Sequence, residues 1–129
     1  MDRTYIATED RHSGFYQGLR NSLKSAGVNI VDSPANATAI FSIHTDITSQ
    51  RVLAVSARNV PREYEVYYTV TYSLESGETI LLEPRTQTQT SAYTWDETKV
   101  LGKAQEEQVL RDAIVDDLVR VVMIQIASL

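Results

Sequence analysis

The sequence contains no cysteine, only three prolines and five glycines, and no long apolar run. Without cysteine, disulfide bridges, thiolate chemistry and cysteine-ligated zinc are excluded. No window approaches the ~20 apolar residues that a membrane-spanning helix requires. Residues 1–10 also lack the apolar segment of a signal peptide. The absence of cysteine is equally compatible with the cytosol and the periplasm.

Basic residues are also scarce, because 12 lysines and arginines stand against 17 acidic residues and give a net charge of -5. A nucleic-acid binder needs a basic surface to displace counterions, so we expect no nucleic-acid partner. The length of 129 residues suits a single domain over residues 1–129. Hydrophobic residues make up 43% of the chain, which is ordinary for a globular domain.

The hydrophobic pattern predicts the element order β-α-β-β-β-β-α. A helix is expected from the N-cap Ser13 to Gly27, and a long final helix over about residues 100–127. Strict alternation over residues 63–74 predicts a strand with one apolar face and one polar face. We therefore expect an α+β two-layer sandwich. Its mostly antiparallel sheet has four to five strands, two helices cover one face, and the other face is open.

Residues 39–57 predict one long strand that is weak near Gln50, or two short collinear strands. Alternation puts Thr45 and Ile47 on the face of Phe41, and His44 and Asp46 on the opposite face. Residues 85–95 predict a further strand that is polar on both faces. Its two faces carry alternating sets, of which one is Thr86, Thr88 and Thr90 and the other is Gln87, Gln89 and Ser91.

Catalytic patterns are sparse. His44 and Asp46 could form a metal or acid–base pair, although two solvated polar residues are the simpler interpretation. Glu63 and Glu65 are paired carboxylates of the kind that glycosidases use across a cleft, but no other pattern predicts a cleft. Phosphate-binding and nucleophile motifs are absent. We therefore expect no enzyme, no cofactor and no metal, with a small hydrolase using Glu63, Glu65 or His44 as the alternative.

Arginines gather around one predicted hairpin tip. Residues 48–62 contain three arginines, Arg51, Arg58 and Arg62, and no acidic residue, and Arg85 enters an adjacent strand. Such a tip can hold a phosphate or another anion. The alternative is ordinary solvated turn residues, which also protect sheet edges.

Three segments in this order, LRNSLKSAGVNIVDSPANATA, REYEVYYTVTYSL and YTWDETKVLGKAQEEQVLRDAIVDDLV, resemble the LptE family of outer-membrane lipopolysaccharide-assembly lipoproteins. The resemblance covers nearly the whole chain. Members begin with a signal peptide, a lipidated cysteine and a short anchor segment. This sequence has none of them, so we expect that they were removed. The resemblance implies membrane attachment through that N-terminal lipid, at the periplasmic side of the outer membrane.

The resemblance implies a non-enzymatic role. LptE lies as a plug inside the LptD β-barrel, supports its folding and binds lipopolysaccharide. A lysine and an arginine are linked with that binding, and they correspond here to Lys103 and, one residue from the aligned position, Arg58, with Arg62 nearby. A lysine in the first turn of a helix suits an anion held together with free helix N–H groups. The alternative for Lys103 is a solvated surface lysine.

The interior of a membrane barrel is polar, so a plug needs a surface of hydroxyls and amides. We expect this partner-facing surface on the open face of the sheet, formed by Tyr67, Thr69, Thr71, Gln87, Gln89 and Ser91. The threonines Thr86, Thr88 and Thr90 then line the helix-covered side, or their strand is an edge that is wet on both faces. The alternative function is a periplasmic lipoprotein or adaptor of the same two-layer class that does not bind lipopolysaccharide.

Overall fold

The computed structural model describes residues 2–55, 57, 61–94 and 103–129, with 61, 62, 93, 94 and 103–107 described in their backbone only. The elements are β1 (Arg3–Ala7), α1 (Gly14–Ser25), β2 (Asn29–Ile30), the short 3-10 helix η1 (Pro34–Asn36), β3 (Ala39–Val55), β4 (Pro61–Ser76), β5 (Thr79–Thr94) and α2 (Lys103–Ala127). The predicted order is confirmed. The stretch that could have been two strands is one continuous β3.

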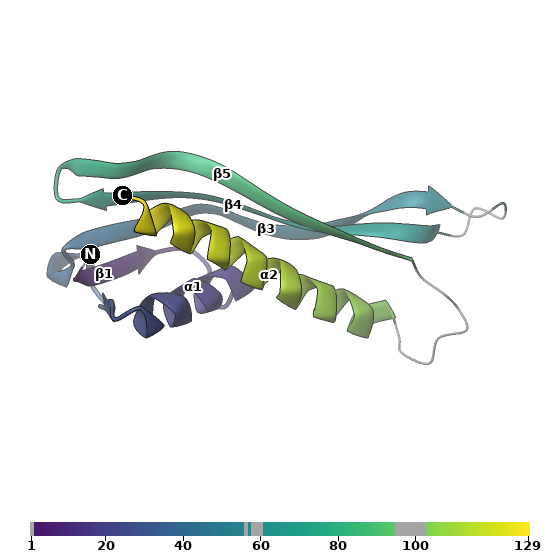
Figure 1. The fold of residues 1–129 in the computed structure, drawn as a ribbon, viewed down its shortest axis with the longest axis horizontal. Helices are drawn as coiled ribbons and strands as arrows, with labels where there is room; N and C mark the ends of the chain where they lie inside the picture. Colours follow the sequence, from purple (N-terminus) through teal and green to yellow (C-terminus); the bar gives the residue numbers. More distant parts are fainter. Residues whose placement is uncertain (1, 56, 58–60, 95–102) are drawn as a thin grey trace.

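The sheet has the strand order β2-β1-β3-β4-β5, and both helices cover the same face of it (Figure 1). β1 pairs in parallel with β2 and with β3, whereas β3, β4 and β5 are antiparallel to their neighbours. Because a parallel pair needs a crossover connection, α1 bridges β1 and β2. The predicted α+β two-layer sandwich is confirmed, with a mixed sheet.

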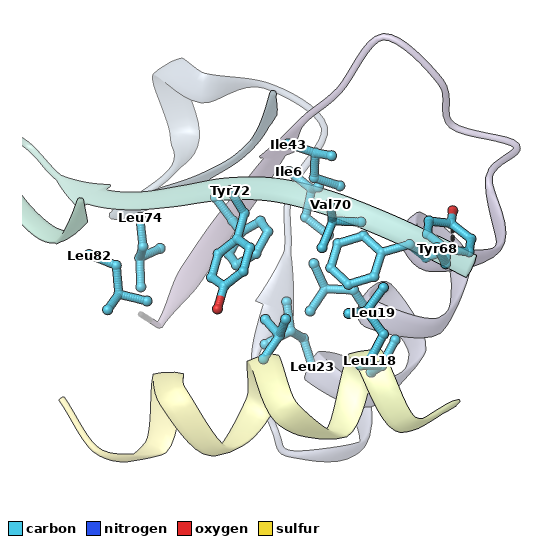
Figure 2. Packing of buried hydrophobic residues seen from close by; sticks show 14 of the residues in the cluster. Ile6, Leu19, Leu23, Ile43, Tyr68, Val70, Tyr72, Leu74, Leu82 and Leu118 are labelled. Atoms are coloured by element: carbon cyan, nitrogen blue, oxygen red, sulfur yellow. Dashed lines mark hydrogen bonds between the residues drawn. The ribbon is translucent and has the colours of Figure 1, made fainter. Parts of the chain in front are cut away.

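The core lies between the sheet and the two helices. Phe15, Leu19 and Leu23 are buried at spacings of four along α1, which is the stripe of an amphipathic helix. Figure 2 shows side chains of β4, including Val70 and Tyr72, pointing from the sheet toward α2. The Tyr72 ring stacks on Phe41, with 5.4 Å between the ring centroids. The helix-covered face of the sheet therefore carries the hydrophobic core.

The two helices approach each other closely at glycines of α1. A Cβ atom on Gly18 would lie 3.0 Å from Cγ2 of Val119, and one on Gly14 would lie 3.2 Å from Cγ2 of Val115. These glycines are four residues apart and therefore share one face of α1. The valine methyl groups of α2 fill the space that larger side chains would need.

A hydrogen-bonded cluster joins the start of α1 to the sheet. The Ser13 hydroxyl accepts from the Tyr16 N–H at 3.0 Å, as predicted for an N-cap. The Phe15 N–H donates to the Tyr68 hydroxyl at 3.2 Å, and that hydroxyl donates to Oδ1 of Asp46. Burial raises the pKa of Tyr68, and the bond to Asp46 raises it further. N–H groups of the first helical turn thus find partners on the chain.

The register of β3 changes at His44, and this corrects the predicted faces of the strand. Ile43 pairs with Tyr72 but Thr45 pairs with Thr71, so His44 is an extra residue. Such a bulge reverses which side chains face the core. The predictions that Thr45 and Ile47 share the face of Phe41 and that Asp46 lies on the opposite face are therefore wrong. Ile47 lies on the open side, where 54% of its surface is exposed.

Candidate functional site

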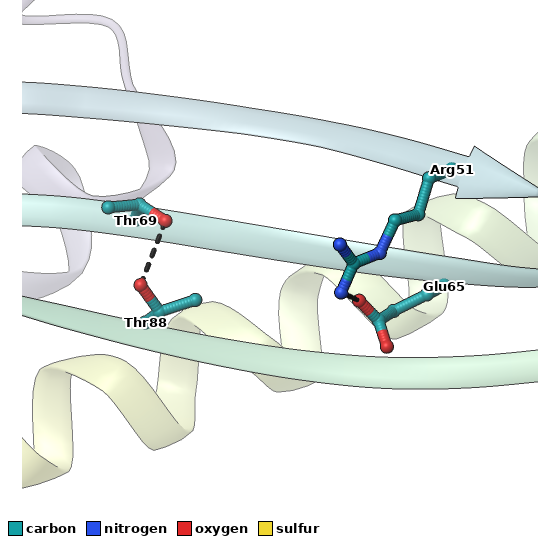
Figure 3. A network of polar contacts seen from close by, with 4 residues as sticks. All are labelled: Arg51, Glu65, Thr69 and Thr88. Atoms are coloured by element: carbon teal, nitrogen blue, oxygen red, sulfur yellow. Dashed lines mark hydrogen bonds and ion pairs between the residues drawn. The ribbon is translucent and has the colours of Figure 1, made fainter.

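The sheet surface opposite the helices carries an ordered array of hydroxyl groups. We call it the open face, and its central residues are Thr45, Ile47, Ser49, Tyr67, Thr69, Thr71, Thr86, Thr88 and Thr90. Thr69 pairs with Thr88 across the strands, and their hydroxyl oxygens are 2.9 Å apart (Figure 3). The next pair, Thr71 and Thr86, is joined at 2.8 Å. Cross-strand threonine pairs of this kind stabilise a sheet while leaving the surface polar.

Gln87, Gln89 and Ser91 lie on the opposite side of the sheet from this array. They pair with Val70, Tyr68 and Val66, which are core residues, and they are half-buried. The prediction that they share a face with Tyr67, Thr69 and Thr71 is therefore wrong. Of the two alternatives for Thr86, Thr88 and Thr90, a position on the helix-covered side is wrong, because these three are exposed on the open face, and their strand β5 is an edge strand of the sheet. The faces of these residues cannot be found by counting alternate positions from the buried Leu82, because a register shift interrupts the β4–β5 ladder between Leu82 and Arg85.

An ion pair lies on the open face, toward the end of the sheet where β3 ends and β4 begins. Arg51 of β3 contacts Glu65 of β4 (Figure 3), and its guanidinium carbon lies 5.8 Å from the centroid of the Tyr67 ring. The arginine side chain is 64% exposed, so solvent screens most of the attraction. Arg51 therefore has an acidic partner in the neighbouring strand, although residues 48–62 contain no acidic residue.

The predicted lipopolysaccharide-binding residues fall largely outside what the structure describes. Arg58 lies outside the described residues, and Arg62 in β4 and Lys103 at the start of α2 are described in their backbone only. α2 begins at the end of the molecule where β3 ends and β4 begins, on the right of Figure 1. Arg85 lies elsewhere, opposite Tyr72 on the helix side of the sheet. Burial raises the pKa of Tyr72, and the charge of Arg85 acts against this.

The side chains considered for catalysis are separated or already paired. Nε2 of His44 lies 2.8 Å from the Ser73 hydroxyl, whereas Asp46 points to the other side and binds Tyr68. Glu65 contacts Arg51. Within the described part of the chain, no three histidine, cysteine or acidic residues gather as a metal site. In the same part, no helix combines the length and apolar character needed to cross a membrane.

Several solved structures share this fold. The minor lipoprotein of Acinetobacter baumannii has a TM-score of 0.78 at 21% identity, over 98% of this chain and 91% of that one. The rare lipoprotein B of Shewanella oneidensis has a TM-score of 0.81 at 20% identity, over 98% and 94%. Lipoprotein B of Nitrosomonas europaea has a TM-score of 0.80 at 23% identity, over 94% and 79%.

The family assignment comes from the sequence itself. No curated protein matches the chain. A family model described as LptE, lipopolysaccharide-assembly, matches residues 1–126, which is nearly the full length and agrees with the fold. The chain belongs to the LptE family of lipopolysaccharide-assembly proteins.

Proposed function

We propose that this chain is a non-enzymatic outer-membrane lipoprotein that occupies the lumen of the LptD barrel, supports its assembly and binds lipopolysaccharide. Family membership supports the general role in lipopolysaccharide assembly. The observation that carries the barrel interaction is the open face, a hydroxyl-rich sheet surface that neither of the described helices α1 and α2 covers.

The chemistry of the open face suits the polar interior of a membrane barrel. Each threonine hydroxyl can donate one hydrogen bond and accept others, so it can pair with many kinds of partner. Neutral hydroxyls also cost less to desolvate than charged groups. The open face therefore replaces the earlier residue set as the proposed contact surface. It keeps Tyr67, Thr69 and Thr71 and substitutes Thr86, Thr88 and Thr90 for the glutamines and Ser91.

Lipopolysaccharide binding is proposed at the end of the molecule where α2 begins. Lys103 starts that helix, Arg62 lies at the start of β4, and Arg58 lies between β3 and β4 in the chain. Phosphate groups would be held there by cationic side chains together with free N–H groups of the first helical turn. A lipidated N-terminal anchor segment, as in the family, would hold the domain at the periplasmic side of the outer membrane.

The test is co-purification of a full-length, lipidated form with LptD from outer membranes. We expect a one-to-one complex, and we expect Thr69→Glu/Thr88→Glu to reduce the LptD recovered at least tenfold. Two carboxylates would replace a bonded hydroxyl pair and would have to be desolvated on binding. Ser25→Glu/Asn36→Glu is the matched control, because it adds the same charge at exposed positions away from the open face.

The outcomes separate the parts of the proposal. Equal recovery of LptD with both double variants would remove the open face as the contact surface. If the unmodified protein never recovers LptD while both proteins are folded, the adaptor function without lipopolysaccharide binding takes precedence. The hydrolase alternative would instead be supported by hydrolysis of a substrate that is lost when His44, Glu63 or Glu65 is changed, while the recovery of LptD stays the same.

A further inference from the structure

A cavity of about 440 Å³ lies at the opposite edge of the sheet from β5, between α1 and the strands β1 and β2. Its polar lining includes Tyr5, Arg11, Gln17, Arg20, Asn21 and Asp32. The residues of the open face do not contribute to it. The cavity is therefore a different surface from the open face.

Two independent pieces of local structure bring the arginines to this cavity. Arg20 lies one turn after Tyr16 on α1, and both line the same side of the helix. Arg11 lies in the turn before α1, where Oδ1 of Asp10 accepts from the His12 N–H at 2.9 Å. Its Nη2 lies 3.5 Å from the Tyr5 hydroxyl. Both guanidinium groups therefore come from segments whose backbone is fixed by regular hydrogen bonds.

The cations of this cavity are not neutralised by the protein. Among the residues that the structure describes, the ion pairs are Arg51 with Glu65 and Arg120 with Asp117. Arg11 and Arg20 take part in neither, although the chain carries a net charge of -5. Asp32 lines the cavity without forming an ion pair to them. Guanidinium groups match phosphate and carboxylate geometry, so the cavity offers two cationic groups, each with several N–H donors, to an anion.

The other lining residues limit which kind of anion the cavity can bind. Asp32 repels a bare anion but accepts hydrogen bonds from hydroxyl groups, and the amides of Gln17 and Asn21 both donate and accept. The volume also exceeds the need of a lone phosphate and falls within the ~300–1,000 Å³ of ordinary ligand pockets. We propose that this cavity binds a phosphorylated sugar, either free or as the headgroup of a glycolipid. The guanidinium groups hold the phosphate, and Asp32 with the amides holds the ring hydroxyls.

The test is an NMR titration of the labelled protein with glucose 6-phosphate, using glucose and inorganic phosphate as separate probes. We expect saturable shifts around Arg11, Arg20 and Asp32 with a Kd below about 1 mM. Arg20→Gln should raise that Kd at least tenfold. Arg120→Gln is the matched control, since it removes the same charge on α2, and its Kd should stay within twofold. An unchanged spectrum away from the cavity shows that the Arg20 variant is folded.

A competition arm with lipopolysaccharide micelles identifies the source of the ligand. Displacement of glucose 6-phosphate, read from its phosphorus signal, assigns the cavity to a lipid headgroup. Binding without displacement assigns it to a free sugar phosphate, and both results support the proposal. Absence of saturable shifts with glucose 6-phosphate overturns it. Equal affinity for inorganic phosphate overturns the sugar requirement, and equal affinity for glucose overturns the role of the arginines. None of these readouts depends on LptD.

Discussion

Replacing Tyr68 with phenylalanine tests whether the start of α1 is held by one side-chain hydroxyl. That hydroxyl accepts from the Phe15 N–H and donates to Asp46. Tyr68 is 5% exposed and Phe15 is fully buried. The substitution removes a single oxygen and keeps the ring, so the packing of the core should change little.

The expected loss follows from the two groups that lose a partner. A buried group left unpaired costs ~1–3 kcal/mol, and the Phe15 N–H has no route to solvent water in this position. Oδ1 of Asp46 loses its donor as well, and the second carboxylate oxygen, Oδ2, is already buried without a partner. We therefore expect Tyr68→Phe to lower the free energy of unfolding by about 2–3 kcal/mol. With an m-value of ~1–3 kcal/mol/M in urea, the midpoint should fall by roughly 0.7–3 M.

The assay is urea unfolding followed by circular dichroism at neutral pH. Tyr67→Phe is the matched control, because Tyr67 is the neighbouring residue of β4 but faces the open side. A surface change of this kind typically alters stability by ~0.5 kcal/mol or less. If Tyr68→Phe costs no more than Tyr67→Phe, the cluster does not hold α1 and the reasoning fails.

Two further predictions concern the helix contact and alkaline stability. Gly18→Leu should destabilise the fold by ~1–3 kcal/mol in urea, because Val119 leaves no room beyond a Cβ atom. Adding Val119→Ala should restore part of the loss, and strictly additive losses would contradict this. Burial raises the pKa of Tyr68 and Tyr72 above the ordinary value of 10.0. Above that pH the unfolded chain releases protons that the folded chain retains, so stability should fall as the pH rises past 10.0, by at most ~1.4 kcal/mol per pH unit for each tyrosine. Tyr72→Phe should remove its share of that slope in pH-dependent unfolding, and an unchanged slope would refute the assignment.

Element types could be predicted from the sequence because each depends on local periodicity. Leu19 and Leu23 recur with the helical period, and Val66 and Val70 follow the strand period. The parallel pairing of β1 was harder to predict, since β2 comprises only two residues, Asn29 and Ile30. Parallel pairing joins strands that are separated in the sequence, and no local pattern of residues shows which strands will pair.

The faces of β3 and β5 could not be predicted by simple alternation. His44 is an extra residue in β3. The β4–β5 pairing shifts between Tyr72 and Leu74 of β4, opposite the part of the edge strand β5 that contains Pro84. A proline lacks the N–H that a regular ladder needs, so its position was a usable sign of irregular pairing. The cavity between α1 and β2 was not predicted, because Arg11 and Asp32 are separated in sequence and meet only through the crossover.

The pairing of β3 differs along its length, and this affects where the sheet can open locally. β1 pairs with β3 only from Ala39 to Ser42, so among the described residues the remainder of β3 has a paired neighbour on one side alone. Backbone amides beyond Ser42 are protected mainly by the ladder with β4. Hydrogen–deuterium exchange should therefore form a gradient along a single strand, from slow exchange beside Phe41 to fast exchange toward Val55. One end of the sheet opens only with the whole fold, while the other opens in independent local fluctuations.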